Sequence, residues 1–217
     1  MDGNTGTSHS RPTLASRVVH MAASPTVTLA ELNAASAQAF VGLLGSIVEH
    51  SPWIAERCLA ARPFTSIEDV RLAILSQLGA LRSDALDDLF RLHPELAGAE
   101  AVAGAMTADS MTEQGRLGLT SLDSTQLKLL NELNAAYRAK FGFPCIIALR
   151  LHDSLDSVLQ AFGQRIDASL AEARRDNLRE IGEIIRGRLA RLISTQAQPA
   201  SVVGAGGAAA VATYRGS

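Results

Sequence analysis

The feature that most constrains this chain is the recurrence of apolar residues at spacings of three and four along its middle. Because an α-helix turns once in 3.6 residues, each series places its apolar side chains on one helical face. Such faces are hidden from water when the helices pack against one another, so the pattern predicts an all-α fold. The apolar series are Phe40, Leu43, Leu44 and Ile47; Val70, Leu72, Ile74 and Leu75; Leu127, Leu130, Leu133, Tyr137 and Phe141; Leu159, Phe162, Ile166 and Leu170; and Leu178, Ile181, Ile185, Leu189 and Leu192.

Helix-start signals precede several of these series. Ser66 with Asp69, and Asp123 with Gln126, have the spacing of a capping box, while Asp153 precedes a third series. The only strand-like run, Cys145 to Leu149, has no candidate partner strand, so we expect an extended loop or a helix entry there rather than a sheet. These signals predict a compact single-domain bundle of about seven to nine helices.

Composition divides the 217 residues into a core and two tails. The chain is 47% hydrophobic, which is enough for a sizeable core and excludes global disorder. Residues 1–26 are rich in Ser, Thr and Gly, and residues 196–217 are rich in Gly and Ala, without helical periodicity. We therefore expect a helical domain over 27–195 between a flexible N-terminal extension and a flexible tail.

Charge and cysteine content narrow the function classes. Lys and Arg number 20 against 22 Asp and Glu, so the chain lacks the basic surplus of nucleic-acid and anionic-membrane binders. Cys58 and Cys145 lie far apart, which argues against a disulfide framework or a zinc–thiolate site and favours reduced thiols in the cytoplasm. There is no apolar run of about 18 residues, no metal-ligand spacing and no phosphate-binding glycine loop, so we expect no membrane span, metal or nucleotide cofactor.

His93-Pro94 is the first candidate for chemistry. A proline disfavours helical geometry at the preceding residue, so His93 should lie at a helix end and present a titratable imidazole as a general acid or base. The alternative interpretation is a simple helix stop. His50, in the run EHSPW, is interpreted as a structural helix cap.

Two further segments and one helix supply polar candidates. Ser110 and Glu113 are three residues apart and match a helix cap; alternatively, Glu113 accepts hydrogen bonds from the N–H groups of a ligand. The segment FGFPCIIAL, residues 141–149, is either plain core or a loop whose free backbone groups bind a small polar heterocycle. Arg186 and Arg188 on the last helix are either solvated charges or, if one points inward, a fork for a carboxylate.

Taken together, these pieces resemble the OHCU decarboxylases, which act on 2-oxo-4-hydroxy-4-carboxy-5-ureidoimidazoline in urate breakdown. The resemblance spans about residues 28–193. Its marks, in chain order, are Leu32-Asn33, EHSPWIAER at 49–57, RPF at 62–64, HPEL at 93–96, AG at 97–98, S-x-x-E-Q at 110–114, GL at 118–119, LNAAY at 133–137, FGFP at 141–144 and GRL at 187–189. The chain departs from the pattern at Cys145, where Phe is usual, and at Leu92, where a small residue is frequent.

The resemblance implies a set of site residues. It makes His93, Glu113 and Arg188 catalytic, with Arg186 as the alternative if the last helix aligns differently. Substrate binding is implied for Pro94, for Ser110, Met111, Thr112, Glu113 and Gln114, and for Cys145, Ile146, Ile147, Ala148 and Leu149.

The implied reaction is cofactor-independent decarboxylation of the imidazoline to (S)-allantoin and CO2, the third step from urate to allantoin. The resemblance further suggests a cytoplasmic homodimer with a small-molecule substrate and no nucleic-acid or membrane partner. Two alternatives stay open at this stage: a binding module without catalysis that retains an old pocket, and a decarboxylase of a related ureido or imidazoline acid.

Overall fold

The computed structural model describes residues 26–98 and 105–194. The predicted tails, 1–26 and 196–217, lie outside the described residues except for residue 26. The described part contains nine α-helices, which confirms the all-α prediction. They are α1 (Leu29–Ala34), α2 (Ala37–Leu44), α3 (Pro52–Cys58), α4 (Ile67–Gly79), α5 (Ser83–Arg91), α7 (Ala108–Arg116), α8 (Ser124–Phe141), α9 (Leu155–Ile166) and α10 (Leu170–Leu192).

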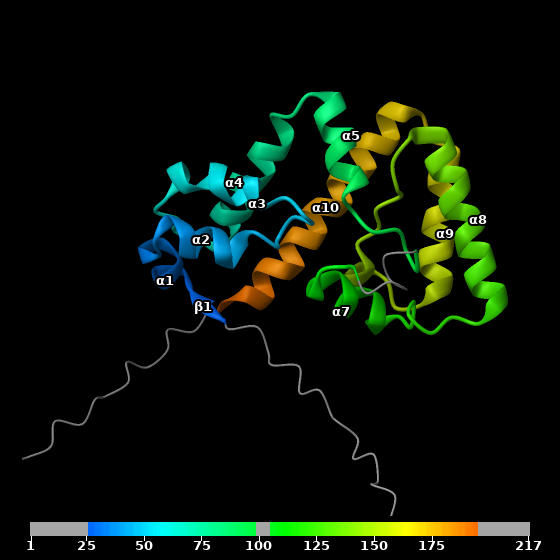
Figure 1. The fold of residues 1–217 in the computed structure, drawn as a ribbon, viewed down its shortest axis with the longest axis horizontal. Helices are drawn as coiled ribbons and strands as arrows, with labels where there is room; N and C mark the ends of the chain where they lie inside the picture. The colour runs from blue at the N-terminus through cyan, green and yellow to red at the C-terminus, as the bar shows by residue number, and fades with distance from the viewer. Residues whose placement is uncertain (1–25, 99–104, 195–217) are drawn as a thin grey trace, which may run out of the picture.

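Helix α10 organises the molecule. It runs between a group formed by α1 to α4 on one side and the pair α8 and α9 on the other (Figure 1). Its buried residues recur at helical spacing, and they include Ile181, Ile185 and Leu189. A single long helix therefore supplies side chains to both halves of the core.

Most helix starts follow the sequence signals. Asp123 caps α8, and the Gln126 side chain accepts the Asp123 backbone N–H at 3.2 Å, which completes the predicted capping box. Ser66 caps α4, whereas α9 begins one residue later than expected, because Ser154 rather than Asp153 is its cap.

Two short strands were not predicted. Val27–Thr28 (β1) pairs in parallel with Ile193–Ser194 (β2), which follows α10 directly. The pairing joins segments from opposite ends of the domain, so no short-range sequence pattern predicts it. It places the start and the end of the described chain next to each other (Figure 1).

An aromatic cluster anchors the segment that follows α8. Phe143 is fully buried, and its ring centroid lies 5.1 Å from that of Phe90 on α5 and 6.3 Å from that of Tyr137 on α8. Residues 144–148 then continue without helix or strand, as predicted, before a 3-10 turn, η2 (Leu149–Leu151). A second such turn, η1 (Leu59–Ala61), follows α3.

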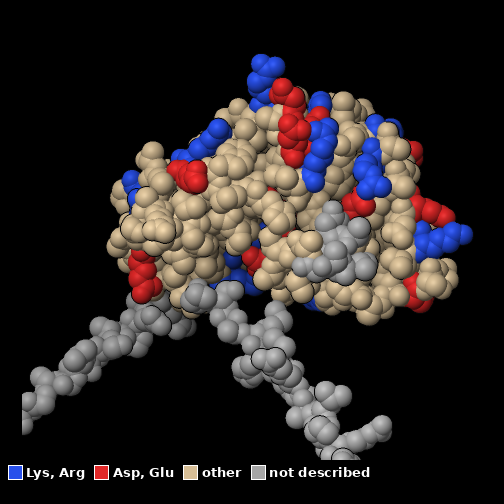
Figure 2. All heavy atoms as spheres, in the orientation of Figure 1, with Lys and Arg blue, Asp and Glu red and all other residues tan. Residues whose placement is uncertain are grey.

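The surface carries mixed charge. Figure 2 shows lysine and arginine side chains interspersed with aspartate and glutamate over one face, with no broad patch of a single sign. Among the described residues, no helix has both the length and the apolarity that crossing a membrane requires.

Candidate active site

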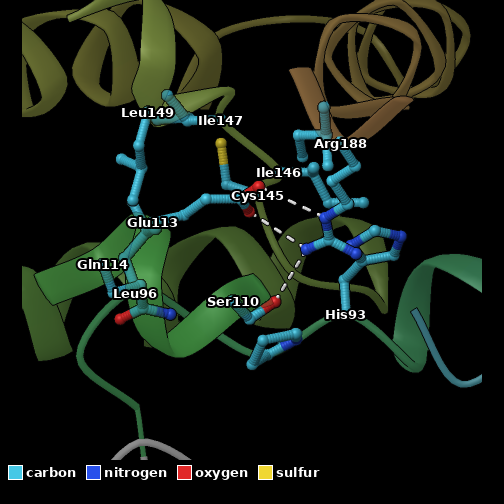
Figure 3. Close-up of a pocket in the computed structure, with 12 residues that line it drawn as sticks. His93, Leu96, Ser110, Glu113, Gln114, Cys145, Ile146, Ile147, Leu149 and Arg188 are labelled. Atoms are coloured by element: carbon cyan, nitrogen blue, oxygen red, sulfur yellow. Dashed lines mark hydrogen bonds and ion pairs between the residues drawn. The ribbon is translucent and has the colours of Figure 1, made fainter. Parts of the chain in front are cut away.

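A pocket lies where α7, the segment 145–149 and α10 meet the chain that leaves α5 (Figure 3). The pocket opens to solvent, and its space, open mouth included, is about 380 Å³. The lining residues are His93, Pro94, Leu96, Ser110, Glu113, Gln114, Cys145, Ile146, Ile147, Leu149, Ile184 and Arg188.

His93 lies just beyond the end of α5, where the predicted helix stop occurs, and its backbone N–H donates to the Phe90 carbonyl. The imidazole is buried, and its Nε2 atom has no hydrogen-bond partner among the described residues. Burial lowers the pKa of His93 to about 4, with the positive charges of Arg188 and His50 acting in the same direction and Glu49 opposing them. The side chain is therefore neutral near pH 7, and a helix stop alone does not explain a buried, unpaired ring nitrogen on a residue that lines a pocket.

The predicted cap at Ser110 is wrong. Helix α7 begins one turn earlier, and Thr107 is its cap, accepting the Ser110 backbone N–H at 3.3 Å. The segment Ala108-Asp109 is itself helical, so Ser110 sits inside the first turn with its side chain free for other contacts. That hydroxyl donates to Glu49 Oε2 at 2.8 Å and accepts from Arg188 Nη2 at 3.0 Å.

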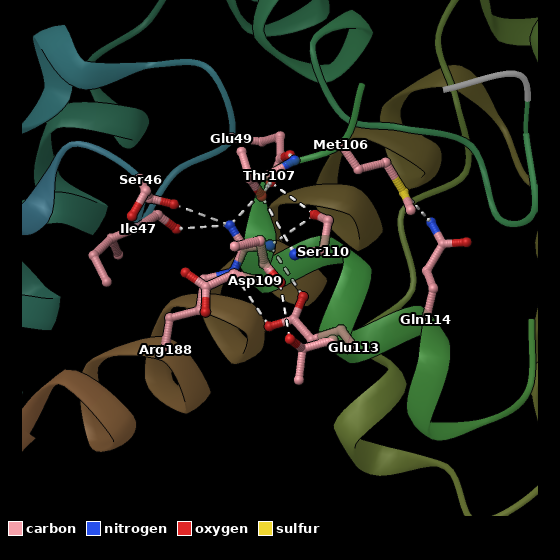
Figure 4. A network of polar contacts seen from close by, with 12 residues as sticks. Ser46, Ile47, Glu49, Met106, Thr107, Asp109, Ser110, Glu113, Gln114 and Arg188 are labelled. Atoms are coloured by element: carbon pink, nitrogen blue, oxygen red, sulfur yellow. Dashed lines mark hydrogen bonds and ion pairs between the residues drawn. The ribbon is translucent and has the colours of Figure 1, made fainter. Parts of the chain in front are cut away.

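Arg188, and not Arg186, is the inward arginine. The Arg188 side chain is 1% exposed, whereas that of Arg186 is 50% exposed and pairs with Glu183 on the surface. A guanidinium has five N–H groups, and Arg188 uses all of them within the protein. Its partners are Glu113 Oε1 and Oε2, Ser110 Oγ, Glu49 Oε2 and the Ser46 carbonyl, with Ile47 as a longer additional contact. The predicted carboxylate fork exists, and in this structure it holds Glu113 (Figure 4).

Glu113 receives two arginines. Arg188 binds it in a bidentate manner, with Nε and Nη2 at 3.2 and 3.0 Å from its two oxygens. Arg191, one turn further along α10, reaches Glu113 Oε1 and Asp109 Oδ1, both at 3.0 Å. Two positive charges hold this carboxylate at the pocket wall, where its side chain remains 17% exposed.

The segment 145–149 is fixed by side chains from neighbouring helices. Asn177 on α10 accepts the Ile146 N–H at 3.0 Å and donates to the Pro144 carbonyl at 2.9 Å. Glu180 accepts the Ala148 N–H at 2.9 Å, and Arg116 on α7 donates to the Leu149 carbonyl. Within the described part of the chain, the backbone N–H of Ile147, a residue that lines the pocket, has no hydrogen-bond partner.

Comparison with known proteins supports the family resemblance seen in the sequence. The sequence profile of the OHCU decarboxylases matches residues 33–190. The chain belongs to this family. The mouse 2-oxo-4-hydroxy-4-carboxy-5-ureidoimidazoline decarboxylase is 36% identical over 163 residues, 75% of this chain and 91% of the relative. The enzyme of the same name from Haloferax volcanii is 34% identical over 170 residues, 78% of this chain and 98% of the relative.

A solved structure described as an (S)-allantoin synthase is also similar. It superposes with a TM-score of 0.60 at 26% identity, over 77% of this chain and 54% of that one. The two folds therefore match over most of the present domain.

The structure places most of the residues implied by the resemblance at the pocket, with three exceptions. Met111 and Thr112 on α7 do not line it: Met111 is solvent-exposed, and the Thr112 hydroxyl donates back to the Ala108 carbonyl within the helix. A helix turns one face to the pocket, so Ser110, Glu113 and Gln114 lie there while the two intervening residues do not. Ala148 is buried beside the lining and is not part of it.

Gln114 lines the pocket, but its amide is occupied by the protein. Its Oε1 accepts the Ala97 N–H at 2.9 Å, and its Nε2 donates to the Glu95 carbonyl at 3.2 Å. These contacts tie α7 to the chain that follows His93-Pro94. Gln114 thus positions the loop that carries the histidine.

Sequence reasoning missed two members of the polar network. Glu49 is fully buried behind the pocket, and Arg191 lies at its edge. Glu49 had a signal, because it follows the apolar pair Ile47-Val48 and opens the run EHSPW. Arg191 had none, since one arginine among several on an exposed helical face is ordinary.

Proposed function

We propose that this protein decarboxylates 2-oxo-4-hydroxy-4-carboxy-5-ureidoimidazoline to (S)-allantoin and CO2. One observation carries the proposal: a neutral, unpaired imidazole at His93 faces a pocket whose other wall offers Glu113 and Ser110 as hydrogen-bond acceptors. Family membership names the substrate, because the mouse and Haloferax volcanii relatives bear that enzyme's name.

The substrate supplies its own electron sink. Its carboxylate is on a ring carbon next to a C=N bond, so loss of CO2 leaves an electron pair that this bond accepts, and a ring nitrogen takes up a proton. The resulting enol becomes allantoin when the 4-hydroxyl loses its hydrogen and C5 gains one. The protein must hold the ring, turn the carboxylate out of its plane and protonate one face.

A neutral His93 suits the last step. It can accept the 4-hydroxyl hydrogen through its free ring nitrogen and then deliver a proton to C5, acting first as base and then as acid. Glu113 accepts ring or ureido N–H groups, and the unpartnered Ile147 N–H donates to a substrate carbonyl. In this mechanism Arg188 holds Glu113 in place through two hydrogen bonds.

We further propose that the reaction needs no cofactor, that the protein is a cytoplasmic homodimer and that its partner is the small substrate alone. Two free, buried cysteines support a reducing compartment. Addition of EDTA should leave turnover unchanged. Sedimentation should report twice the mass of the 22.9 kDa chain.

The test is a coupled assay that begins with urate, urate oxidase and hydroxyisourate hydrolase and is followed by circular dichroism. Spontaneous decay of the intermediate gives racemic allantoin, whereas the enzyme should give an optically active product. A racemic product formed at the spontaneous rate would favour the alternative function, a small-molecule binding module without catalysis. Optical activity from a related ureido acid, and none from this substrate, would reassign the substrate.

A further inference from the structure

Glu49 is a buried carboxylate that lies behind the pocket without lining it. It belongs to the turn between α2 and α3, and its side chain is fully buried. Its Oε1 accepts the Thr107 N–H at 3.2 Å, and its Oε2 accepts the hydroxyls of Thr107 and Ser110 at 2.9 and 2.8 Å. Arg188 Nη1 donates to the same Oε2 at 3.0 Å.

These contacts determine which way the Ser110 hydroxyl points. A carboxylate only accepts hydrogen bonds and a guanidinium only donates them. The single hydroxyl hydrogen of Ser110 therefore points at Glu49, and one lone pair of the Ser110 oxygen accepts a hydrogen bond from Arg188. What Ser110 still offers to the pocket is an acceptor, and it has no hydrogen left to donate.

We propose that Glu49 is a positioning residue of this site: it orients Ser110 as an acceptor, holds Arg188 in place and sets a negative charge behind His93. Ser110 and Glu113 then present acceptors to the pocket that Ile147, whose N–H has no partner in the described chain, also lines. Such acceptors recognise an edge of a ring or ureido group that carries N–H. The inference deepens the proposed function and relies on it for the identity of the ligand.

Charge balance supports this role. Arg188 and His50 lower the pKa of His93 in addition to the effect of burial, and Glu49 is the group that raises it. Burial opposes ionisation of Glu49, yet Arg188 and the Thr107 and Ser110 donors keep its pKa below the ordinary value. Glu49 is thus an anion near neutral pH, and its charge limits how far the His93 pKa falls.

The experiment compares the full chain with Glu49→Gln, Ser110→Ala and the double variant. We expect Glu49→Gln to lower kcat/KM by about tenfold or more, the loss typical of a charged hydrogen bond. The loss should be smaller when Ser110→Ala is already present, because the orienting contact is then gone. Glu183→Gln is the matched control: it removes a carboxylate paired with Arg150 on the outer side of α10 and should leave kcat/KM unchanged.

A second readout needs no substrate. NMR of histidine-labelled protein should show a lower His93 pKa in Glu49→Gln than in the wild type, because the nearby negative charge that raises it is gone. If Glu49→Gln does not fold, Glu49→Asp replaces it. The shorter acid keeps the charge, so we expect a near-wild-type His93 pKa with reduced kcat/KM.

The outcomes separate the two proposals. An inactive wild type would refute the proposed function, and the NMR titration would still decide the role of Glu49. An active wild type, together with unchanged kcat/KM and an unchanged His93 pKa in Glu49→Gln, would overturn the inference about Glu49. Equal losses from Glu49→Gln with and without the Ser110→Ala change would show that Glu49 does not act through Ser110.

Discussion

At the scale of single residues, the proposed mechanism relies on a few buried polar groups, and His93 is the first of them. His93→Ala and His93→Asn should abolish most turnover, because general acid–base groups typically contribute about 10²–10⁴-fold. His93 lies just beyond the end of α5, and its Nε2 has no hydrogen-bond partner within the described chain, so helix content should be unchanged. Steady-state kinetics beside far-UV circular dichroism measures both; near-full kcat in either variant would remove His93 from the mechanism.

The protonation state of His93 gives a second prediction. If the neutral imidazole is the active form, kcat/KM should fall on acidification through a pKa of about 4 and should not fall on this account as the pH rises to neutral. If His93 instead had to be protonated in the free enzyme, kcat/KM would fall as the pH rises through its pKa. The pH profile of kcat/KM distinguishes the two cases.

The same shift has a stability consequence with a definite sign. The pKa of His93 is lower in the folded protein, about 4, than its ordinary value of 6.5, so between these values the unfolded chain binds more protons. Stability is therefore lost as the pH falls from 6.5 towards 4. His93→Asn should remove a slope of up to about 1.4 kcal/mol per pH unit in urea titrations. If the free energy of unfolding depended on pH equally in the wild type and in His93→Asn, the lowered pKa of His93 would be contradicted.

Changes at Glu113 and at Arg188 should both lower activity, and the change at Arg188 should also lower stability. Glu113→Gln keeps the shape but loses the charged acceptor, so kcat/KM should fall about tenfold or more, consistent with a charged hydrogen bond. Arg188→Lys should reduce kcat/KM comparably, because lysine has no planar fork for Glu113. A solvated helix charge would leave stability unchanged, but Arg188 is buried, so we expect a loss of about 1–3 kcal/mol from stranded acceptors.

The control for this pair is on the same helix. Arg186→Lys alters an exposed arginine and should leave both kcat/KM and the melting temperature near wild type. Activity that falls only in proportion to stability in Glu113→Gln would make that residue structural.

At the scale of elements, the site depends on how helix ends and the segment between α8 and α9 are held. Gly142 ends α8 in the left-handed conformation, with φ of 80°, and its N–H donates to the Arg138 carbonyl. This turn directs the following segment, including Phe143, into the core. Asn177, Glu180 and Arg116 then fix the backbone that lines the pocket.

Gly142→Ala should lower the free energy of unfolding by about 1 kcal/mol, because a Cβ is unfavourable at positive φ. Space is not the reason, since the nearest atom to an added Cβ, on Arg91, lies 3.6 Å away. Gly163→Ala in α9 is the matched control: nothing lies within 4 Å of its added Cβ, and alanine favours a helix by up to about 1 kcal/mol. Equal melting temperatures for the two variants would contradict the strain argument.

At the scale of the whole molecule, the domain is closed by contacts between its ends. The parallel pairing of Val27 with Ile193 and Thr28 with Ser194 lies just inside the predicted domain limits. We expect a fragment of residues 27–196 to keep the stability and kcat/KM of the full chain. Thermal melts and kinetics of the fragment test this, and a large drop in either would show that an end segment docks on the domain.

Much of this architecture was predictable from local pattern. The helical class, the capping box of α8 and the extended segment after Phe143 all followed from short-range rules. The helix stop at His93 and the inward face of α10 were also predictable. The start of α7 was not, because Thr107 and Ser110 are both competent caps and only packing distinguishes them.

The sequence by itself determined which stretches are helical and which residues carry family motifs, since periodicity and spacing act over a few residues. Only the tertiary structure decided that Arg188 points inward, that Glu49 is buried and that Met111 faces away from the pocket. The contacts of Arg188 join residues 75 and 139 positions apart in the chain, to Glu113 and Glu49 respectively. Burial and ion pairing at such separations depend on the packed arrangement of several helices, which no local pattern specifies.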